Sequence, residues 1–216
     1  MKKICILLIV LVSALGLNAK WLYFDAGIGS DYTKISFTKL LRCEGTENLT
    51  GRSYSFYTAP NQSMSLGLRL GSRFALLTNI QSMSVEKRIR FRTELAQLTW
   101  DPSEADHNLH IKDISFTGVG FILYPRHNLQ LRGVLYVGGS NYTDEVTTNN
   151  KVYINSGGGL GGGYDVSLAY DIPINKVGIL LGCRYFKATI RHAAPLSSIE
   201  PEYVVSSTGL FVRIRY

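Results

Sequence analysis

The amino-acid sequence predicts an all-β fold: an eight-stranded antiparallel up-and-down transmembrane β-barrel. Apolar and polar side chains alternate along eight segments with the period of two of a β-strand, and no segment shows a convincing helical period. Short and long connections between these segments strictly alternate. The chain also ends within such an alternating segment, on the aromatic residue Tyr216. Together these features indicate a closed sheet in a lipid environment.

The first 19 residues have the composition of a secretory signal peptide. Lys2 and Lys3 precede an uncharged apolar run over residues 4–12, and small residues precede Lys20. This run is shorter than the roughly 20 apolar residues of a transmembrane helix, although an uncleaved anchor is the alternative. We therefore expect cleavage after Ala19 and one mature outer-membrane β-barrel domain over residues 20–216, with four long extracellular loops.

Composition excludes several classes of function. The chain has 23 Lys and Arg against 16 Asp and Glu, a net charge of +7, which falls to +5 without Lys2 and Lys3. A surplus so small and dispersed predicts no nucleic-acid partner. Loss of Cys5 with the signal leaves Cys43 and Cys183, too few for a disulfide scaffold. Whether these two pair stays open, with two free thiols the favoured expectation.

The eight segments are expected to turn their apolar faces to lipid and their polar faces to the interior. The apolar faces of six segments contain Leu22, Phe24, Ala26 and Ile28; Met64, Leu66, Leu68 and Leu70; Leu129, Leu131, Leu135 and Val137; Tyr164, Val166, Leu168, Tyr170 and Ile172; Val177, Ile179, Leu181, Cys183 and Tyr185; and Leu210, Val212, Ile214 and Tyr216. In the fourth segment, Ile114, Phe116 and Ile122 are assigned to the apolar face. In the third segment, even-numbered positions form the apolar face over residues 74–80 and odd-numbered positions form it from Met83 onward. A β-bulge near Ser82 is expected to produce this change, which leaves Met83 on the apolar face.

The connections place both termini at one end of the barrel and the long loops at the other. Three connections are tight, at residues 71–73, 125–128 and 173–176. Four are long, at about residues 40–62, 92–110, 141–156 and 188–202. Outer-membrane barrels have this layout, with short periplasmic turns and long outer loops. A soluble eight-stranded barrel whose apolar face points inward shows the same alternation and is the alternative.

Aromatic residues on the apolar face favour the transmembrane barrel. Their positions predict two levels, as expected at the two edges of a bilayer, whereas scattered surface tyrosines are the alternative. The predicted aromatic girdle consists of Phe74, Tyr124, Tyr170 and Tyr216 near the short turns and Tyr164 and Tyr185 further along the wall. We therefore expect the protein in the outer membrane of a diderm bacterium, in contact with outer-membrane lipid and exposed at the cell surface.

Charged residues with inward parity predict a polar network in the lumen. The network consists of Asp25, Arg69, Arg132, Asp165, Arg184 and Arg213. An eight-stranded barrel has room only for its own side chains or one small ligand, so we expect these charges to be paired and to exclude water. A selective site for an anionic solute, suggested by the excess of arginine, is the alternative.

No motif indicates catalysis, a metal or a cofactor, and we expect none of the three. The run SGGGLGGGY at residues 156–164 lacks the following helix of a phosphate-binding loop, so it predicts a flexible loop stem or a weak point in the wall. Two histidine groups fall in predicted loops, where we expect their spacing to be coincidental. They are His192 with Ser197, Ser198 and Glu200, and Asp106 with His107 and His110.

The last segment resembles the C-terminal signal of outer-membrane β-barrel proteins, an alternating apolar strand that ends in an aromatic residue. Here it consists of Leu210, Val212, Ile214 and Tyr216, with Tyr in place of the usual Phe. The resemblance implies that the barrel-assembly machinery reads this signal during insertion. In size, strand number and loop layout the chain is similar to the OmpW-like and OmpA/OmpX-like barrels. Its predicted polar lumen departs from the apolar conduit of the OmpW-like group.

Two functions follow from this layout. A porin-like, OmpW-like barrel would pass small hydrophobic solutes across the outer membrane. A non-transporting, monomeric barrel would instead bind host or envelope partners through its surface-exposed loops, because function on a rigid scaffold tends to lie on loops. The sequence does not choose between them.

Overall fold

The computed structural model describes residues 22–41, 53–94, 104–148, 151–175, 177–192 and 199–216. Eight strands account for most of these residues: β1 (Leu22–Leu41), β2 (Ser53–Arg69), β3 (Phe74–Glu94), β4 (Glu104–Arg126), β5 (Leu129–Thr148), β6 (Lys151–Ile174), β7 (Val177–His192) and β8 (Ile199–Arg215). In this part of the chain no helix is long and apolar enough to cross a membrane. The predicted signal peptide and Cys43 lie outside the described residues.

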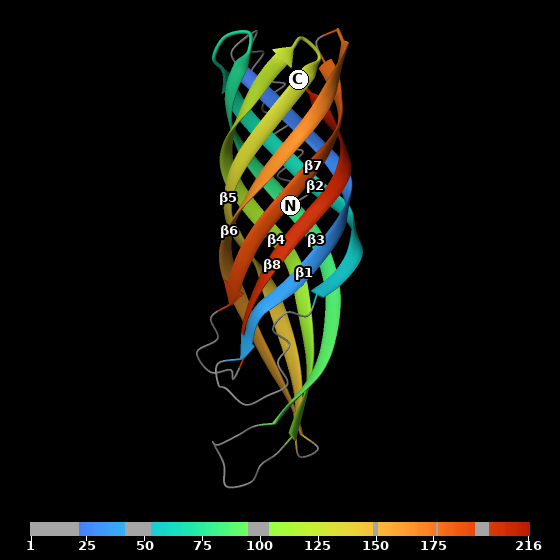
Figure 1. The fold of residues 1–216 in the computed structure, drawn as a ribbon, viewed down its shortest axis with the longest axis vertical. Helices are drawn as coiled ribbons and strands as arrows, with labels where there is room; N and C mark the ends of the chain where they lie inside the picture. The colour runs from blue at the N-terminus through green and yellow to red at the C-terminus, as the bar shows by residue number, and fades with distance from the viewer. Residues whose placement is uncertain (1–21, 42–52, 95–103, 149–150, 176, 193–198) are drawn as a thin grey trace, which may run out of the picture.

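The eight strands close into one antiparallel barrel in chain order (Figure 1). Closure comes from the pairing of β1 with β8, which runs from Asp25 opposite Arg215 to Leu41 opposite Ile199. The backbone N–H of Tyr216 extends this pairing, donating to the carbonyl of Phe24 at 2.9 Å. The predicted fold class is therefore confirmed, and the last residue of the chain is held in the wall.

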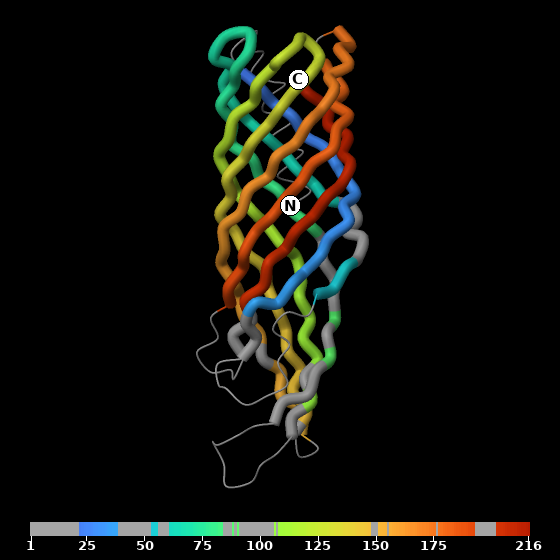
Figure 2. The backbone as a smooth tube through the Cα atoms, viewed as in Figure 1, coloured from blue at the N-terminus to red at the C-terminus, as the bar shows by residue number. Residues whose placement is uncertain are grey.

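Three tight turns join the strands at the end of the barrel where the C-terminus lies (Figure 2). Gly71 (φ 93°) and Asn175 (φ 55°) adopt the left-handed conformation that glycine and asparagine tolerate best. The turn before β3 is closed by the N–H of Leu70, which donates to the carbonyl of Phe74 at 2.8 Å. The three connections predicted to be tight are found as tight connections.

At the opposite end, the strands continue into segments that the sequence predicted as loops. The ladder between β3 and β4 reaches Glu94 opposite Glu104, and the ladder between β5 and β6 reaches Thr148 opposite Lys151. Most of the predicted loops 92–110 and 141–156 is therefore strand. In β4 the alternation is obscured because Asp113 (φ 37°) shifts the register of the strand and changes the phase of the residues before it.

Two further predictions of side-chain direction are wrong. In β4, Ile114, Phe116 and Ile122 are buried in the barrel, whereas Val119 and Phe121 face outward with 63% and 42% of their surface exposed. In β3, the register does shift close to the predicted bulge, between Met83 and Glu86, but Met83 points inward and is fully buried. Alternation fails here because both faces of these strands carry apolar residues.

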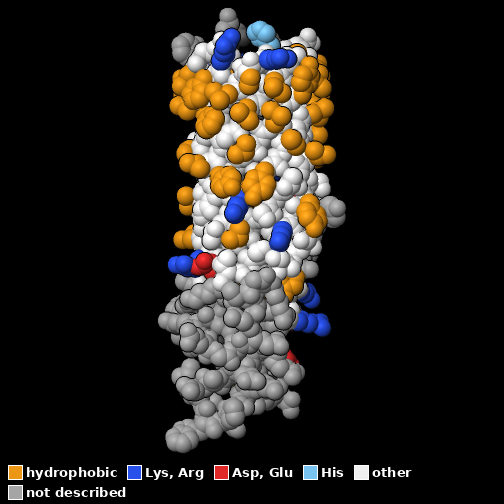
Figure 3. Space-filling view, viewed as in Figure 1, with side chains coloured by type: hydrophobic (Ala, Val, Ile, Leu, Met, Phe, Trp, Pro, Cys, Tyr) orange, Lys and Arg blue, Asp and Glu red, His pale blue; other side chains and the backbone are white. Residues whose placement is uncertain are grey.

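The outer wall carries a band of exposed apolar side chains (Figure 3). Its members lie on strands all around the barrel and include Ile28, Leu68, Leu76, Val119, Leu135, Val137, Val166, Leu181, Leu210 and Ile214. Such a band is unfavourable in water and is matched by lipid, since soluble proteins rarely expose large continuous apolar surfaces. This surface rules out the soluble barrel with an inward apolar face.

Beyond this band, strand pairing is interrupted at two places in the wall. Pairing of β2 with β3 stops at Asn61 opposite Met83, and pairing of β6 with β7 stops at Gly159 opposite His192. Strands β3 to β6 nevertheless remain paired with one another further out (Figure 1). We refer to residues 86–94, 104–112, 141–148 and 151–158 as the outer sheet.

The glycine-rich run is a paired part of the wall rather than a flexible stem. Residues 157–163 pair with β5 throughout, and residues 159–163 also pair with β7. A Cβ atom on the inward-facing Gly159 would lie 2.7 Å from the imidazole ring of His192, which is closer than real contacts allow. A Cβ atom on the outward-facing Gly162 would come no closer than 3.5 Å, to the carbonyl oxygen of Tyr136. Gly159 therefore provides space for the ring of His192.

We predict that Gly159→Ala lowers the free energy of unfolding by about 1 to 3 kcal/mol, because the new methyl group overlaps the ring of His192. The matched control Gly162→Ala should be neutral, or stabilising by up to about 1 kcal/mol. Urea unfolding of the barrel in lipid vesicles, followed by the difference in gel mobility between unboiled and boiled samples, measures both. Equal effects at the two positions would show that the ring does not pack on Gly159.

Candidate functional site: a charged plug inside the barrel

Six charged side chains meet inside the barrel at the height of the apolar band. They come from β1, β5, β6, β7 and β8, and they are Asp25, Asp31, Asp165, Arg132, Arg184 and Arg213. All six are buried. Strand alternation alone directs them inward, since each lies next to residues whose side chains face lipid. We call this group the charged plug.

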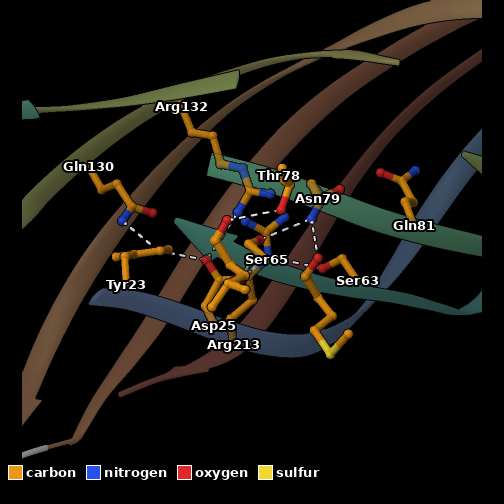
Figure 4. Close-up of polar contacts among 12 residues, drawn as sticks. Tyr23, Asp25, Ser63, Ser65, Thr78, Asn79, Gln81, Gln130, Arg132 and Arg213 are labelled. Atoms are coloured by element: carbon orange, nitrogen blue, oxygen red, sulfur yellow. Dashed lines mark hydrogen bonds and ion pairs between the residues drawn. The ribbon is translucent and has the colours of Figure 1, made fainter. Parts of the chain in front are cut away.

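One half of the charged plug is centred on Asp25 (Figure 4). Its carboxylate lies 3.1 Å from Nη1 of Arg132 and 3.9 Å from Nε of Arg213. Ser65 Oγ donates a hydrogen bond to it at 2.9 Å, and the hydroxyl of Tyr23 donates another at 2.6 Å. Both carboxylate oxygens are thus satisfied, as a buried charge requires.

Uncharged side chains extend this half across the lumen (Figure 4). The Tyr23 hydroxyl accepts a hydrogen bond from Gln130 at 3.0 Å, and Asn79 donates to Ser65 Oγ at 3.0 Å. The hydroxyl of Tyr136 in turn donates to Oδ1 of Asn79 at 2.5 Å. Hydrogen bonds therefore connect β1, β2, β3 and β5 across the interior.

The other half is centred on Asp31. Its carboxylate pairs with the guanidinium of Arg184, with Nε of Arg184 3.2 Å from Oδ1. Asn61 and Ser207 both donate hydrogen bonds to Oδ2, the latter at 2.8 Å. Arg184 also lies 3.8 Å from Asp165, which links this half to β6.

The charged plug contains as many aspartates as arginines, which removes the main argument for an anion-selective site. Asp31 was missed because the predicted strand stopped at Gly29; its odd number, shared with Asp25, was the signal for an inward position. Arg69 was placed in the network by parity but forms no ion pair with a described residue. Its guanidinium instead lies 6.0 Å from the ring centroid of Tyr23.

Beyond the charged plug, the outer half of the interior is lined mainly by apolar and aromatic side chains, with the buried polar residues Ser140, Asp144 and His192 among them. The rings of Phe116 on β4 and Phe186 on β7 meet across it, with centroids 5.2 Å apart. The rings of Phe37 and Tyr203, on the paired strands β1 and β8, are 5.6 Å apart. The buried aliphatic members of this layer are Ile35, Met83, Leu109, Ile111, Ile114, Ile190 and Val205. The lumen is thus filled by side chains at two successive levels.

His192 lies in this outer interior rather than in a loop. Its Nε2 is 3.1 Å from Ser140 Oγ and 3.1 Å from the hydroxyl of Tyr203. No described residue bonds its Nδ1, the atom at which the carboxylate of a hydrolase triad would accept a hydrogen bond. Of its predicted partners, Ser197 and Ser198 lie outside the described residues, and Glu200 lies on β8.

The other predicted histidine group, Asp106, His107 and His110, lies on β4. Among the residues that the structure describes, no group of three His, Cys, Asp or Glu side chains could hold a metal ion.

Five of the six predicted girdle residues lie on the outward face of the wall. Tyr164, Tyr170, Tyr185 and Tyr216 are exposed, and Phe74 is half-buried with its ring 6.4 Å from that of Phe121. Tyr124 differs from the prediction, because its side chain packs inside and its hydroxyl accepts a hydrogen bond from Gln130 at 3.4 Å. The residues of the predicted C-terminal signal, Leu210, Val212, Ile214 and Tyr216, all face outward.

A closed wall, an outward apolar band and a buried charged interior define this chain as a transmembrane β-barrel. No protein-family model and no curated protein sequence matches it. Solved structures to which it is similar include Ail, the attachment invasion locus protein of Yersinia pestis, at 11% identity and a TM-score of 0.47, covering 90% of this chain and 98% of Ail. A second is Neisserial surface protein A, at 14% identity and a TM-score of 0.38. The match covers 90% of this chain and 95% of Neisserial surface protein A. A third is the outer membrane protein OprG from Pseudomonas aeruginosa, at 11% identity and a TM-score of 0.38. The match covers 88% of this chain and 95% of OprG.

We predict that Asp31→Ala lowers the free energy of unfolding by about 3 to 5 kcal/mol, because it removes the nearest partner of the buried Arg184 guanidinium. The control Glu145→Ala removes an exposed carboxylate and should change stability by less than about 0.5 kcal/mol. The same urea unfolding assay measures both variants. A cost below about 1 kcal/mol for Asp31→Ala would mean that water screens the charged plug.

Proposed function

We propose that this protein is a non-conducting barrel of the outer membrane of a diderm bacterium, anchoring an interaction surface at the cell surface. The partner is an extended segment of a host or envelope protein that pairs with the outer sheet. Two features of the structure support this proposal: the filled lumen and the open edge of β6.

The filled lumen argues against a pore. Ions cross a barrel through a hydrated path whose lining replaces their water. Here Arg132 and Arg213 are almost completely buried within the charged plug, and an apolar layer follows it toward the outer end. Eight strands leave little space for water beside these side chains.

The open edge of β6 is the observation that carries the proposal. Residues 151–158 pair with β5 on one side, and no strand in the described part of the chain pairs with them on the other. Val152, Tyr153 and Ile154 on this edge are 64%, 51% and 69% exposed. Unpaired N–H and C=O groups beside exposed β-forming side chains are the surface to which an extended segment adds as a further strand.

Passage of small hydrophobic solutes, as in an OmpW-like barrel, is the second candidate. It is favoured by the apolar outer half of the interior and by the early end of β2–β3 pairing at Asn61 and Met83. A solute there would have to leave through the wall, because the charged plug lies between this layer and the end with the tight turns. The packing of Ile35, Met83 and Phe116, all almost fully buried, makes this the less supported function.

We predict that the purified protein shows little or no steady conductance in planar bilayers and no uptake of a hydrophobic dye into liposomes. Arg132→Ala should lower the urea midpoint, because Asp25 loses its closest cation. A steady conductance that changes in Arg132→Ala at unchanged stability would overturn the sealed lumen. Dye uptake without conductance would make solute passage the leading function.

The open edge can be tested with displayed peptides as the probe. We predict that panning a random ten-residue phage library on the protein in micelles enriches peptides with alternating apolar residues. Their binding should fall at least about tenfold in the variant Val152→Lys/Ile154→Lys, because charges on an edge strand oppose pairing. It should not fall in the control Lys112→Gln, which changes an exposed lysine on β4 away from this edge. Failure to enrich any family, or equal binding by the two variants, would contradict the proposal.

A further inference from the structure

Two lysines project from the outer wall of the barrel next to each other. Lys34 on β1 and Lys187 on β7 both lie opposite Ser206 of the intervening strand β8. Both lysines are exposed. Adjacent strands are about 4.8 Å apart, so the two backbones are separated by about 10 Å. Their flexible four-carbon side chains can therefore converge on one ligand.

No described acidic residue neutralises the positive charge of these lysines. Neither lysine forms an ion pair with a described residue. The carboxylate of Glu202, further out on β8, is engaged by Arg191 at 2.6 Å and accepts a hydrogen bond from Thr38 at 3.1 Å. The wall around Ser206 thus presents two cations and no free carboxylate among the described residues of these strands.

The lysines mark the boundary of the apolar band. Two residues nearer the tight turns on the same three strands are Tyr32, Thr208 and Tyr185, which share one row of the sheet. Tyr32 and Tyr185 are exposed, and the ring of Tyr185 lies 6.2 Å from that of Tyr164. Exposed tyrosines of this kind mark the level of the lipid headgroups in membrane proteins.

An apolar track leads from this boundary along the wall toward the tight turns. On β8 it consists of Leu210, Val212 and Ile214, flanked by Ile28 on β1 and Leu181 on β7, all exposed. On the face shown in Figure 3, basic side chains likewise lie where the apolar band ends. One ligand could therefore place an anionic group on the lysines and hydrocarbon on the track.

We propose that Lys34 and Lys187, with the hydroxyls of Ser206 and Thr208, bind the phosphate-bearing headgroup of a membrane lipid. Its acyl chains lie on the track of Leu210, Val212 and Ile214. Phosphate is the matching group, because lysine binds it as a compact charge with three donors. A lipid is the matching source, because the site opens onto the lipid-facing wall and not onto the interior. This inference is independent of the proposed interaction at the edge of β6.

Native mass spectrometry of the full protein in nonionic detergent tests this proposal, with phosphatidic acid as the probe. Removing both charges in Lys34→Gln/Lys187→Gln should weaken phosphatidic acid binding about 30-fold, at roughly 1 kcal/mol for each lysine near a membrane surface. Ser206→Glu, which places a carboxylate between the two lysines, should weaken it as well. The control Lys151→Gln, an exposed lysine on the outer sheet, should bind as the wild type does.

Two further probes separate the headgroup, the acyl chains and a soluble anion. Diacylglycerol with the same acyl chains should bind weakly and equally to all variants, and millimolar inorganic phosphate should not displace phosphatidic acid. Unchanged binding in the double variant, or equal binding of diacylglycerol to the wild type, would overturn the proposal. Displacement by inorganic phosphate would assign the site to a free anion. Retention of heat-modifiable gel mobility by every variant establishes that the barrel is folded.

Discussion

The closure of β1 on β8 is the constraint on which the rest of the structure depends. Within a bilayer, each unpaired backbone N–H or C=O group costs several kcal/mol, so a membrane-spanning sheet must leave no edge. The pairing of Asp25 with Arg215, continued by the N–H of Tyr216, meets this requirement at the last residues of the chain. Closure with eight strands also makes the interior narrow, and a narrow interior must be filled by side chains.

Two kinds of side chain fill the interior: charged residues at the level of the apolar band, and mainly apolar residues further out. Within the charged plug, each aspartate and arginine is paired or hydrogen-bonded, because an isolated charge would not be tolerated there. Further out, apolar and aromatic side chains pack against inward-facing glycines such as Gly159, whose missing side chain leaves room for His192. The charged plug and the apolar layer are thus consequences of a small radius, and together they favour an anchoring role over a conducting one.

Outside the bilayer the requirement for closure no longer applies, and the wall changes there. Pairing ends between β2 and β3 and between β6 and β7, while the outer sheet continues and its β6 edge pairs with no further strand in the described part of the chain. Water can satisfy backbone groups in this region, so an edge is tolerated and becomes available to a partner strand. The proposed lipid site lies at the transition, where exposed tyrosines give way to Lys34 and Lys187. Both proposed surfaces therefore arise where the environment of the wall changes.

The sequence by itself determined the strand number, the order of closure, the tight turns and the lipid-facing residues of six strands, because these depend on local alternation and turn residues. It also identified five of the six members of the charged plug by parity. Tertiary structure decided which face of β4 points into the barrel, the inward positions of Met83 and Tyr124, and the membership of Asp31 in the charged plug. It also decided the contacts of Arg69 and His192. Alternation cannot orient a strand that is apolar on both faces, and it loses phase at register shifts such as that near Asp113. Contacts across the lumen join residues more than 100 positions apart, such as Asp25 and Arg132, and only the closed ring brings them together.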